Sequence, residues 1–188
     1  VAGRFPEAVA EARRAVELDP LSPAINFVLG VWLYFVRQYD EAIEQIRKTI
    51  ELDPGIVRPH ELLSLVYADA GIYDLAKAEC QVVGSLPGGK SVSRPLLGYV
   101  LAKAGKLDEA RKILEELKPA LGEDLLSTWR SVYLCAALNE FDLAFEWIDK
   151  LYAQRFGLLT LIKGYPALDN LRSDPRYAEL LRRIGLPE

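Results

Sequence analysis

The stretch with the clearest potential for chemistry is Gly84–Ser91, which matches the phosphate-binding pattern Gly-x4-Gly-Lys-Ser letter for letter. In that loop, backbone amides cradle the phosphates, while Lys90 and Ser91 would meet phosphate and magnesium. The pattern needs a β-strand before it, but residues 74–83 have a helical pattern and no strand pattern occurs elsewhere. We therefore favour a glycine-rich turn between helices and keep nucleotide binding through Gly84–Ser91 as an alternative.

The other reactive residue types do not form a recognisable catalytic or metal site. His60 is the only histidine, and no nucleophile or carboxylate can be assigned to it, so we expect it to pack. Cys80 and Cys135 occupy apolar positions of their helices, which predicts two buried small hydrophobes rather than a disulfide. We predict that the chain is not an enzyme and that it uses no metal or cofactor.

The chain is organised by a repeat, of which residues 23–56 are the clearest copy. Two helical patterns flank a break near residues 37–39, where Asp40 can cap the second helix, and Pro54 cannot continue it. The same residues return at steps of 34 along the chain, at Ala8, Ala42, Ala76, Ala110 and Ala144, and at Asp40, Asp74, Asp108 and Asp142. This regular step predicts one helix pair stacked on copies of itself, with each alanine at a helix crossing.

Period, helix pair and residue types together resemble the tetratricopeptide repeat, whose signature is Trp-x2-Leu-Gly-x2-Tyr, then Ala-x3-Phe, then Pro. In residues 23–56 the signature places hold Asn26, Leu29, Gly30, Leu33, Ala42, Ile46 and Pro54. The resemblance covers roughly residues 1–157 and implies an all-α, right-handed solenoid of stacked helix hairpins in a single domain. The expected units are a half repeat at 1–22, full repeats at 23–56, 57–90, 91–124 and 125–157, and a helical cap at 158–188.

In this family the first helices line a concave groove, and repeat positions 2, 5, 9, 12 and 13 contact the ligand. Carried onto this chain, the resemblance implies a peptide-binding row at Phe27, Val31, Tyr34, Phe35, Arg58, Glu61, Leu65, Asp69, Tyr99, Lys103, Trp129 and Tyr133. The row is mostly aromatic and apolar, as a groove for a peptide or helix requires. The alternative, weighed evenly for Phe27, Tyr34 and Phe35, is that these side chains pack against a neighbouring helix.

Composition argues against two classes of partner. The formal net charge is −4, from 23 basic and 27 acidic residues, which is not the footprint of a nucleic-acid-binding protein. The longest uncharged run, residues 20–36, is shorter than the ~20 residues that cross a bilayer, and its phase fits a first helix. We expect no membrane span, and with no visible signal peptide the expected location is the cytoplasm.

The N-terminal end departs from the full repeat. The chain contains no methionine, and residues 4–19 have the phase of a second helix without its first, so we expect a fragment of a longer protein. The apolar side of this helix, around Phe5, Ala8 and Ala12, should be under-covered. Self-association through this half repeat, as a homodimer, is therefore an alternative function.

The C-terminal end breaks the period and carries a second resemblance. Residues 166–187 read Pro-x-Leu-Asp-x-Leu-Arg-Ser-Asp-Pro-Arg-Tyr-x-x-Leu-Leu-Arg-Arg-Ile-Gly-Leu-Pro. This string resembles the end of bacterial signalling proteins that carry tetratricopeptide arrays behind a serine/threonine kinase, an adenylate cyclase or a winged-helix domain. Leu180, Leu181 and Ile184 should pack the last helix on the fifth repeat. We predict a protein–protein interaction scaffold that binds a peptide or helix in its concave groove, as the sensory or regulatory part of such a protein.

Overall fold

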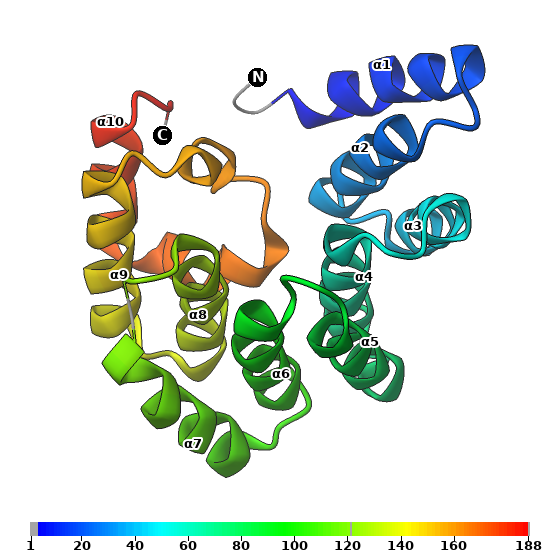
Figure 1. The fold of residues 1–188 in the computed structure, drawn as a ribbon. Helices are drawn as coiled ribbons and strands as arrows, with labels where there is room; N and C mark the ends of the chain where they lie inside the picture. The colour runs from blue at the N-terminus through cyan, green and yellow to red at the C-terminus, as the bar shows by residue number, and fades with distance from the viewer. Residues whose placement is uncertain (1–3, 121, 188) are drawn as a thin grey trace.

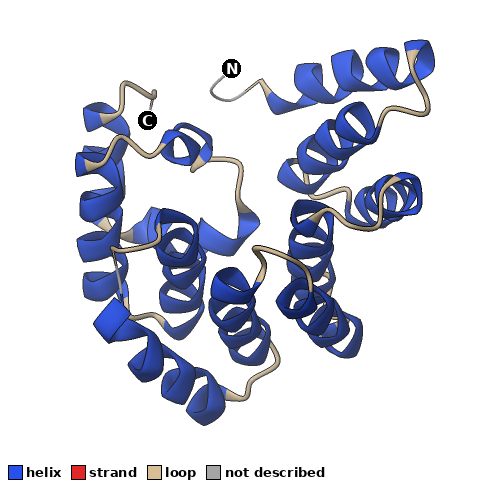
Figure 2. Ribbon diagram, viewed as in Figure 1, coloured by secondary structure: helices blue, strands red, loops and turns tan. Residues whose placement is uncertain are grey.

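The computed structural model describes residues 4–120 and 122–187, and this part of the chain is a curved stack of helices without a β-strand (Figure 1). Figure 2 shows the same helices joined by short loops. The helices are α1 (Phe5–Leu18), α2 (Pro23–Phe35), α3 (Tyr39–Leu52), α4 (Val57–Asp69), α5 (Tyr73–Ser85), α6 (Lys90–Lys103), α7 (Leu107–Leu117), α8 (Leu125–Leu138), α9 (Phe141–Ala153) and α10 (Pro175–Arg183), with short 3₁₀ helices η1 (Lys118–Ala120), η2 (Gly157–Leu161) and η3 (Pro166–Ser173). The all-α solenoid expected from the period is confirmed.

Local sequence sets several of the helix boundaries. The Ser22 hydroxyl accepts a hydrogen bond from the Ile25 amide at 3.4 Å, and Pro23 occupies the first helical position of α2. Asp174 caps α10 in the same way, because its Oδ1 atom accepts a hydrogen bond from the Arg176 amide at 2.9 Å. The prediction that Asp40 caps α3 is wrong, because α3 already begins at Tyr39. Asp40 lies in the first turn, where its charge favours the helix dipole.

The turn inside each hairpin contains one residue in the left-handed backbone conformation. These residues again follow the step of 34 and are Arg37, Gly71, Gly105 and Asn139, with φ angles of 64°, 80°, 77° and 59°. Glycine adopts this conformation without the steric cost that a side chain brings. In the first and last of these turns, Arg37 and Asn139 therefore adopt a backbone conformation that favours glycine.

Small residues allow the helices to approach closely, as the repeat predicts. The alanines of the repeat are fully buried in α3, α5, α7 and α9. A Cβ atom added at Gly30 would lie 2.7 Å from a side-chain carbon of Ile46, and one at Gly98 would lie 2.7 Å from Leu134. Since real Cβ contacts are longer, both glycines mark positions where neighbouring helices leave no space.

At the N-terminal end, α1 packs against α2. Val9 and Ala12 of α1 are buried, and the Phe5 ring lies 5.5 Å from the Phe35 ring between centroids. Phe5 and Ala8 are half-buried, so only part of the apolar side is under-covered. The large apolar residue that is most exposed in this region is Leu18, at the end of the helix.

The C-terminal tail does more than cap the stack. α10 lies beside α9, where Arg176 pairs with Asp142 at 2.8 Å and Arg183 with Asp149 at 2.6 Å. Leu180 and Leu181 are buried and Ile184 is half-buried. Before α10, however, η3 turns back into the curve and packs against α8 and α4, where it appears in orange in Figure 1.

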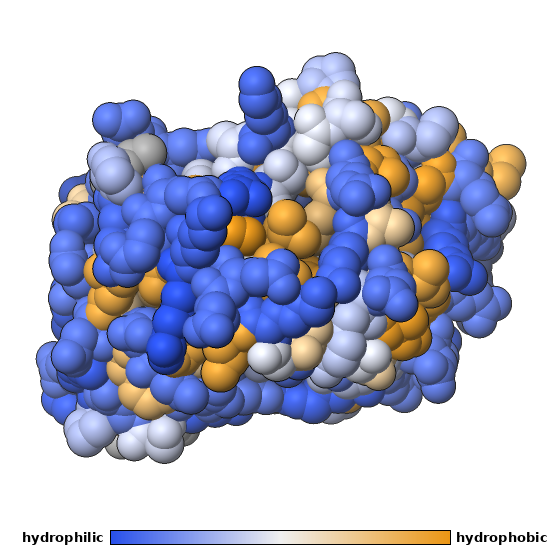
Figure 3. Space-filling model, turned by 90° about the horizontal axis from the view of Figure 1, so that it is seen from below, coloured by the Kyte–Doolittle hydropathy of each residue, from blue (hydrophilic) through white to orange (hydrophobic). Residues whose placement is uncertain are grey.

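The face of the molecule seen in Figure 3 is mostly hydrophilic. In the view of Figure 3, hydrophobic residues form small separate groups between hydrophilic ones. Across residues 4–120 and 122–187, no helix combines the length and apolar character needed to cross a bilayer.

Candidate binding groove

The concave groove predicted from the repeat is present, but the chain itself fills most of it. Residues 157–173 follow α9 and precede α10 in the sequence, and they run along the inner face of the stack. We call this segment the plug. Seven residues of the predicted row are buried, namely Tyr34, Phe35, Glu61, Leu65, Tyr99, Trp129 and Tyr133. Phe27 and Val31 are half-buried, and Arg58 and Lys103 are exposed.

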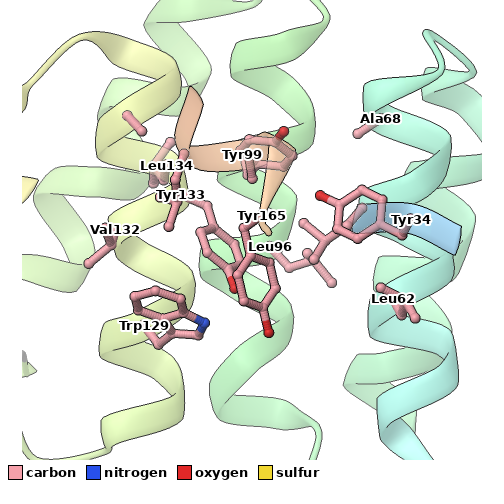
Figure 4. Packing of buried hydrophobic residues seen from close by; sticks show 14 of the residues in the cluster. Tyr34, Leu62, Ala68, Leu96, Tyr99, Trp129, Val132, Tyr133, Leu134 and Tyr165 are labelled. Atoms are coloured by element: carbon pink, nitrogen blue, oxygen red, sulfur yellow. The ribbon is translucent and has the colours of Figure 1, made fainter. Parts of the chain in front are cut away.

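Tyr165 is the centre of the plug. Its ring lies 4.8 Å from Phe35, 5.6 Å from Trp129 and 5.5 Å from Tyr133, measured between centroids. Figure 4 shows Tyr165 beside Tyr133 in the middle of the inner face, with Trp129 below them and Tyr34 on the opposite wall. Aromatic pairs at these separations add to the stabilisation from burial alone. The side chains from α2 and α8 thus form an aromatic box around one residue of the plug.

One polar cluster joins the first helices of three successive repeats. The Asp69 carboxylate accepts hydrogen bonds from the hydroxyls of Tyr34, at 2.8 Å, and Tyr99, and Lys103 Nζ lies 2.9 Å from it. Burial and then the Asp69 charge raise the pKa of Tyr34 and of Tyr99 well above the usual value. Four residues of the predicted row therefore meet, but they hold α2, α4 and α6 together.

A buried ion pair lies below the plug. Arg130 Nε and Nη2 donate to the two carboxylate oxygens of Glu61 at 3.0 and 3.2 Å, which joins α8 to α4. Burial lowers the pKa of Arg130, but Tyr133 and the Glu61 charge outweigh this effect and raise it above the usual value. The cost of burying such a two-pronged pair is offset only while both partners are present.

The groove keeps one open mouth beside the plug. A cavity of about 60 Å³ is lined by Phe27, Val31, Arg58, Glu61, Leu62, Leu65, Arg130, Leu158, Leu161 and Tyr165. The Arg58 guanidinium lies 5.1 Å from the centre of the Phe27 ring, a cation–π contact. Within the described residues Arg58 makes no ion pair, so its charge is available to a ligand.

Two side-chain contacts hold the rim of the plug. Arg37 Nη2 lies 2.5 Å from the Asp169 carboxylate, and both side chains are about two-fifths exposed. The Asn170 amide donates to the Ala136 carbonyl at 3.2 Å and to the Asn139 side chain at 3.5 Å. Arg37 and Asn139 are the two left-handed hairpin-turn residues that are not glycine. Both of their side chains contact the plug.

The remaining candidates for chemistry have structural roles. The segment Gly84–Ser91 joins α5 to α6, so a helix stands where a phosphate-binding loop needs a strand. A Cβ at Gly89 would lie 1.9 Å from the Val83 carbonyl oxygen, so glycine allows this tight turn. His60, to which the sequence assigned no carboxylate, contacts Glu79 at 2.7 Å and links α4 to α5.

Cys80 and Cys135 are buried free thiols, as expected. Burial raises the pKa of Cys80 to about 11 and that of Cys135 above its ordinary range. Both thiols therefore stay protonated near neutral pH. Within residues 4–120 and 122–187, acidic, histidine and cysteine side chains do not gather into a group that could hold a metal ion.

Sequence reasoning missed the residues that decide how the groove is used. Tyr165 lies outside the repeat, so no periodic position pointed to it. Arg130 is not in the ligand row of the family, yet it is the only charged residue in α8. A lone charge in an otherwise uncharged helix was the available signal for a buried partner, and Glu61 on α4 is that partner.

Comparison with known proteins supports the fold and leaves the role open. No family model and no curated protein matches the chain. A solved structure from the functional characterisation of Pseudomonas aeruginosa pilF aligns with 97% of this chain and 85% of that chain, at 21% identity and a TM-score of 0.55. The likeness supports the fold already described, an all-α solenoid of stacked helix hairpins.

A second solved structure, of Naa15/Naa10 bound to HypK-THB, aligns with 97% of this solenoid and 29% of that chain, at 18% identity and a TM-score of 0.43. That score is too low to carry an argument. At such identities a likeness in structure speaks for the fold, and function has to be argued from the groove.

Proposed function

We propose that this chain is a protein–protein interaction scaffold that binds a peptide segment of a partner on its concave face. The observation that carries the proposal is the plug, because a non-repeat segment of polypeptide already lies in the groove with one aromatic residue in a box. Stacked first helices commonly bind extended or helical segments in this way. The tail motif adds the narrower proposal of a regulatory role in a larger bacterial signalling protein.

The open mouth indicates what part of a partner the groove accepts. Phe27 and Val31 offer apolar surface there, and Arg58 adds a positive charge that has no acidic partner in the described chain. A partner segment with an apolar residue next to a carboxylate would bury the first and pair the second. The plug itself forms part of this mouth through Leu158, Leu161 and Tyr165, so a segment that binds here meets the plug.

A peptide display experiment tests this proposal. The whole chain is immobilised, peptides are selected from a random library, and the dissociation constants of the selected peptides are measured by fluorescence anisotropy. Arg58→Glu and Val31→Asp should each weaken binding about tenfold, which corresponds to about 1.4 kcal/mol. Leu75→Asp on the outer helix α5, where the leucine is 43% exposed, is the matched control and should change nothing. Selection of no peptide, or of peptides that bind all variants equally, would refute the proposal.

A further inference from the structure

We infer that the plug is an intramolecular ligand that inhibits the groove, and that the partner segment displacing it carries the same chemistry. That chemistry is a glycine followed by an aromatic residue, with an acidic residue four positions after the aromatic. The inference rests on the proposed function, since it assigns the ligand class and the regulation of the same groove. It starts from three features of the plug: its fit, its fastening and its imperfections.

The fit of the plug is specific to its residue types. A Cβ atom at Gly164 would lie 2.3 Å from the Phe35 ring, so a larger residue there would separate the plug from α2. Tyr165 follows and enters the aromatic box, where it is 9% exposed. Asp169, four residues further on, reaches Arg37. A competing segment needs the same three features to make the same contacts.

The fastening of the plug at its rim is weak and depends on unusual residues. An ion pair as exposed as Arg37–Asp169 is worth about 0.2–1 kcal/mol. Arg37 keeps a left-handed backbone at φ 64°, a conformation that costs a side chain free energy and that glycine adopts at Gly71 and Gly105. The residue is thus placed against the local backbone preference, and its side chain closes the rim.

The contact between plug and groove is also imperfect. The indole nitrogen of Trp129 is buried and has no hydrogen-bond partner in the described chain, which costs about 1–3 kcal/mol. In Figure 4 this nitrogen points toward the central tyrosine rings. Separately, a cavity of about 60 Å³ lies next to Tyr165. A partner segment that offers a carbonyl oxygen to Trp129 and fills this cavity would bind more tightly than the plug does.

The ends of the plug stay attached when it leaves the groove. α9 precedes it, and α10 contacts α9 through the Arg176 guanidinium over the Phe145 ring and the Arg183 guanidinium over the Tyr152 ring, each 4.5 Å from the ring centre, in addition to two exposed ion pairs. α10 also packs against η3, the second half of the plug. Opening is therefore a local detachment of residues 157–173 between two anchored helices. Because the plug is tethered, its effective concentration at the groove is high. The apparent affinity for a partner equals the intrinsic affinity multiplied by the fraction of chains whose plug is open.

The experiment adds a fluorescein-labelled synthetic peptide of residues 157–173 to the whole chain and measures anisotropy. Asp169→Arg weakens the plug but leaves Arg37 in place, so this variant should bind the peptide about two- to fivefold more tightly than the unaltered chain. Tyr165→Ser should increase the binding further. Glu116→Arg breaks the similarly exposed Arg94–Glu116 ion pair between α6 and α7, outside the plug and its anchors, and is the matched control, with no change expected. A peptide with serine in place of the tyrosine should fail to bind any of them.

Hydrogen exchange on the unaltered chain provides a measurement that needs no variant. The amides of the plug should exchange by local opening, ahead of those in α8, and faster in Asp169→Arg. The inference is overturned if the plug exchanges only together with α8, or if folded Asp169→Arg binds the peptide no better than the unaltered chain. A dimer with exchanged plugs, seen by light scattering, would also overturn an intramolecular role.

These outcomes separate the inference from the proposed function. If the plug never opens but selected peptides bind at Val31 and Arg58, the scaffold proposal stands and the inhibitory plug is refuted. If the plug opens and accepts its own peptide in trans but no library peptide binds, the groove takes only its own segment, and the scaffold proposal fails.

Discussion

The repeats and the plug bury similar aromatic and aliphatic side chains, yet they are built on different principles. Within the repeats, contacts return at every step of 34: a buried alanine, a close helix approach and a left-handed turn residue. Within the plug no contact recurs at a fixed step: Gly164 and Tyr165 both meet Phe35, and Asp169 meets Arg37. The repeats contact their nearest neighbours along the stack, whereas the plug contacts the stack from outside the repeat, at α8 and α4.

The difference also lies in what each region does with polar groups. Between repeats, the Asp69 carboxylate is satisfied by two tyrosines and a lysine. Below the plug, Trp129 keeps an unsatisfied indole nitrogen. A permanent core excludes such groups, while a site that exchanges ligands tolerates them. We expect substitutions in the two regions to differ in whether they unfold the stack or only open the groove.

The largest effect should come from the buried ion pair that lies between the two regions. Arg130→Met leaves the Glu61 carboxylate buried without a partner, and the free energy of unfolding should fall by about 3–5 kcal/mol. Chemical denaturation followed by circular dichroism measures this loss. Replacing both residues, Glu61→Met with Arg130→Met, should recover most of it, because no unpaired charge remains. A double variant as unstable as the single one would show that the pair is not the cause.

A somewhat smaller effect is expected where two repeats touch. Gly98→Val places a branched side chain against Leu134 and Ile113, whose atoms would lie 2.7 and 3.1 Å from the new Cβ. Overpacking of this kind costs about 1–3 kcal/mol, and because the repeats are coupled the whole stack should melt earlier. Gly157→Ala is the control, since a Cβ there meets nothing within 4 Å. A melting temperature unchanged by Gly98→Val would contradict the close helix approach.

These two regions also mark what the sequence could reveal. The step of 34 predicted the hairpins and the buried alanines, because both follow from local spacing. The inward direction of the first helices was implied by the resemblance to the tetratricopeptide repeat. It also brought Tyr34, Asp69, Tyr99 and Lys103 to one face, although their contacts with each other came only from the structure.

The occupied state of the groove could not be predicted, because it depends on a contact between residues far apart in sequence. Arg37 and Asp169 are separated by 132 positions, and neither residue type predicts a contact with the other. Tyr165 lies in a segment without period, where pattern reasoning has no register to use. The tail was therefore expected as an end cap, and its return to α2 is the feature that changes how the groove is understood.

Tyr165→Ala should separate local opening from global unfolding. Truncating a large buried aromatic side chain in a permanent core costs about 3–5 kcal/mol. Here we expect a loss of about 1 kcal/mol or less in the denaturation midpoint of the stack, because the plug is already open before the repeats unfold. Hydrogen exchange should show protection lost in residues 157–173 and retained in α4, α6 and α8. A loss of protection in those helices would place Tyr165 in the core of the stack.

The smallest effect on stability, and the finest test of the comparison, is Arg37→Gly. Glycine suits the left-handed turn and removes a steric cost, but it also gives the unfolded chain more freedom and deletes the contact to Asp169. The net change in unfolding free energy should stay within about 0.5 kcal/mol, while the plug amides exchange about two- to fivefold faster. Gly105→Ala is the opposite substitution at the equivalent turn, and it should destabilise the stack by about 1 kcal/mol without any change in the plug. If Arg37→Gly instead stabilised the chain and left plug exchange unaltered, the arginine would have no function in holding the plug.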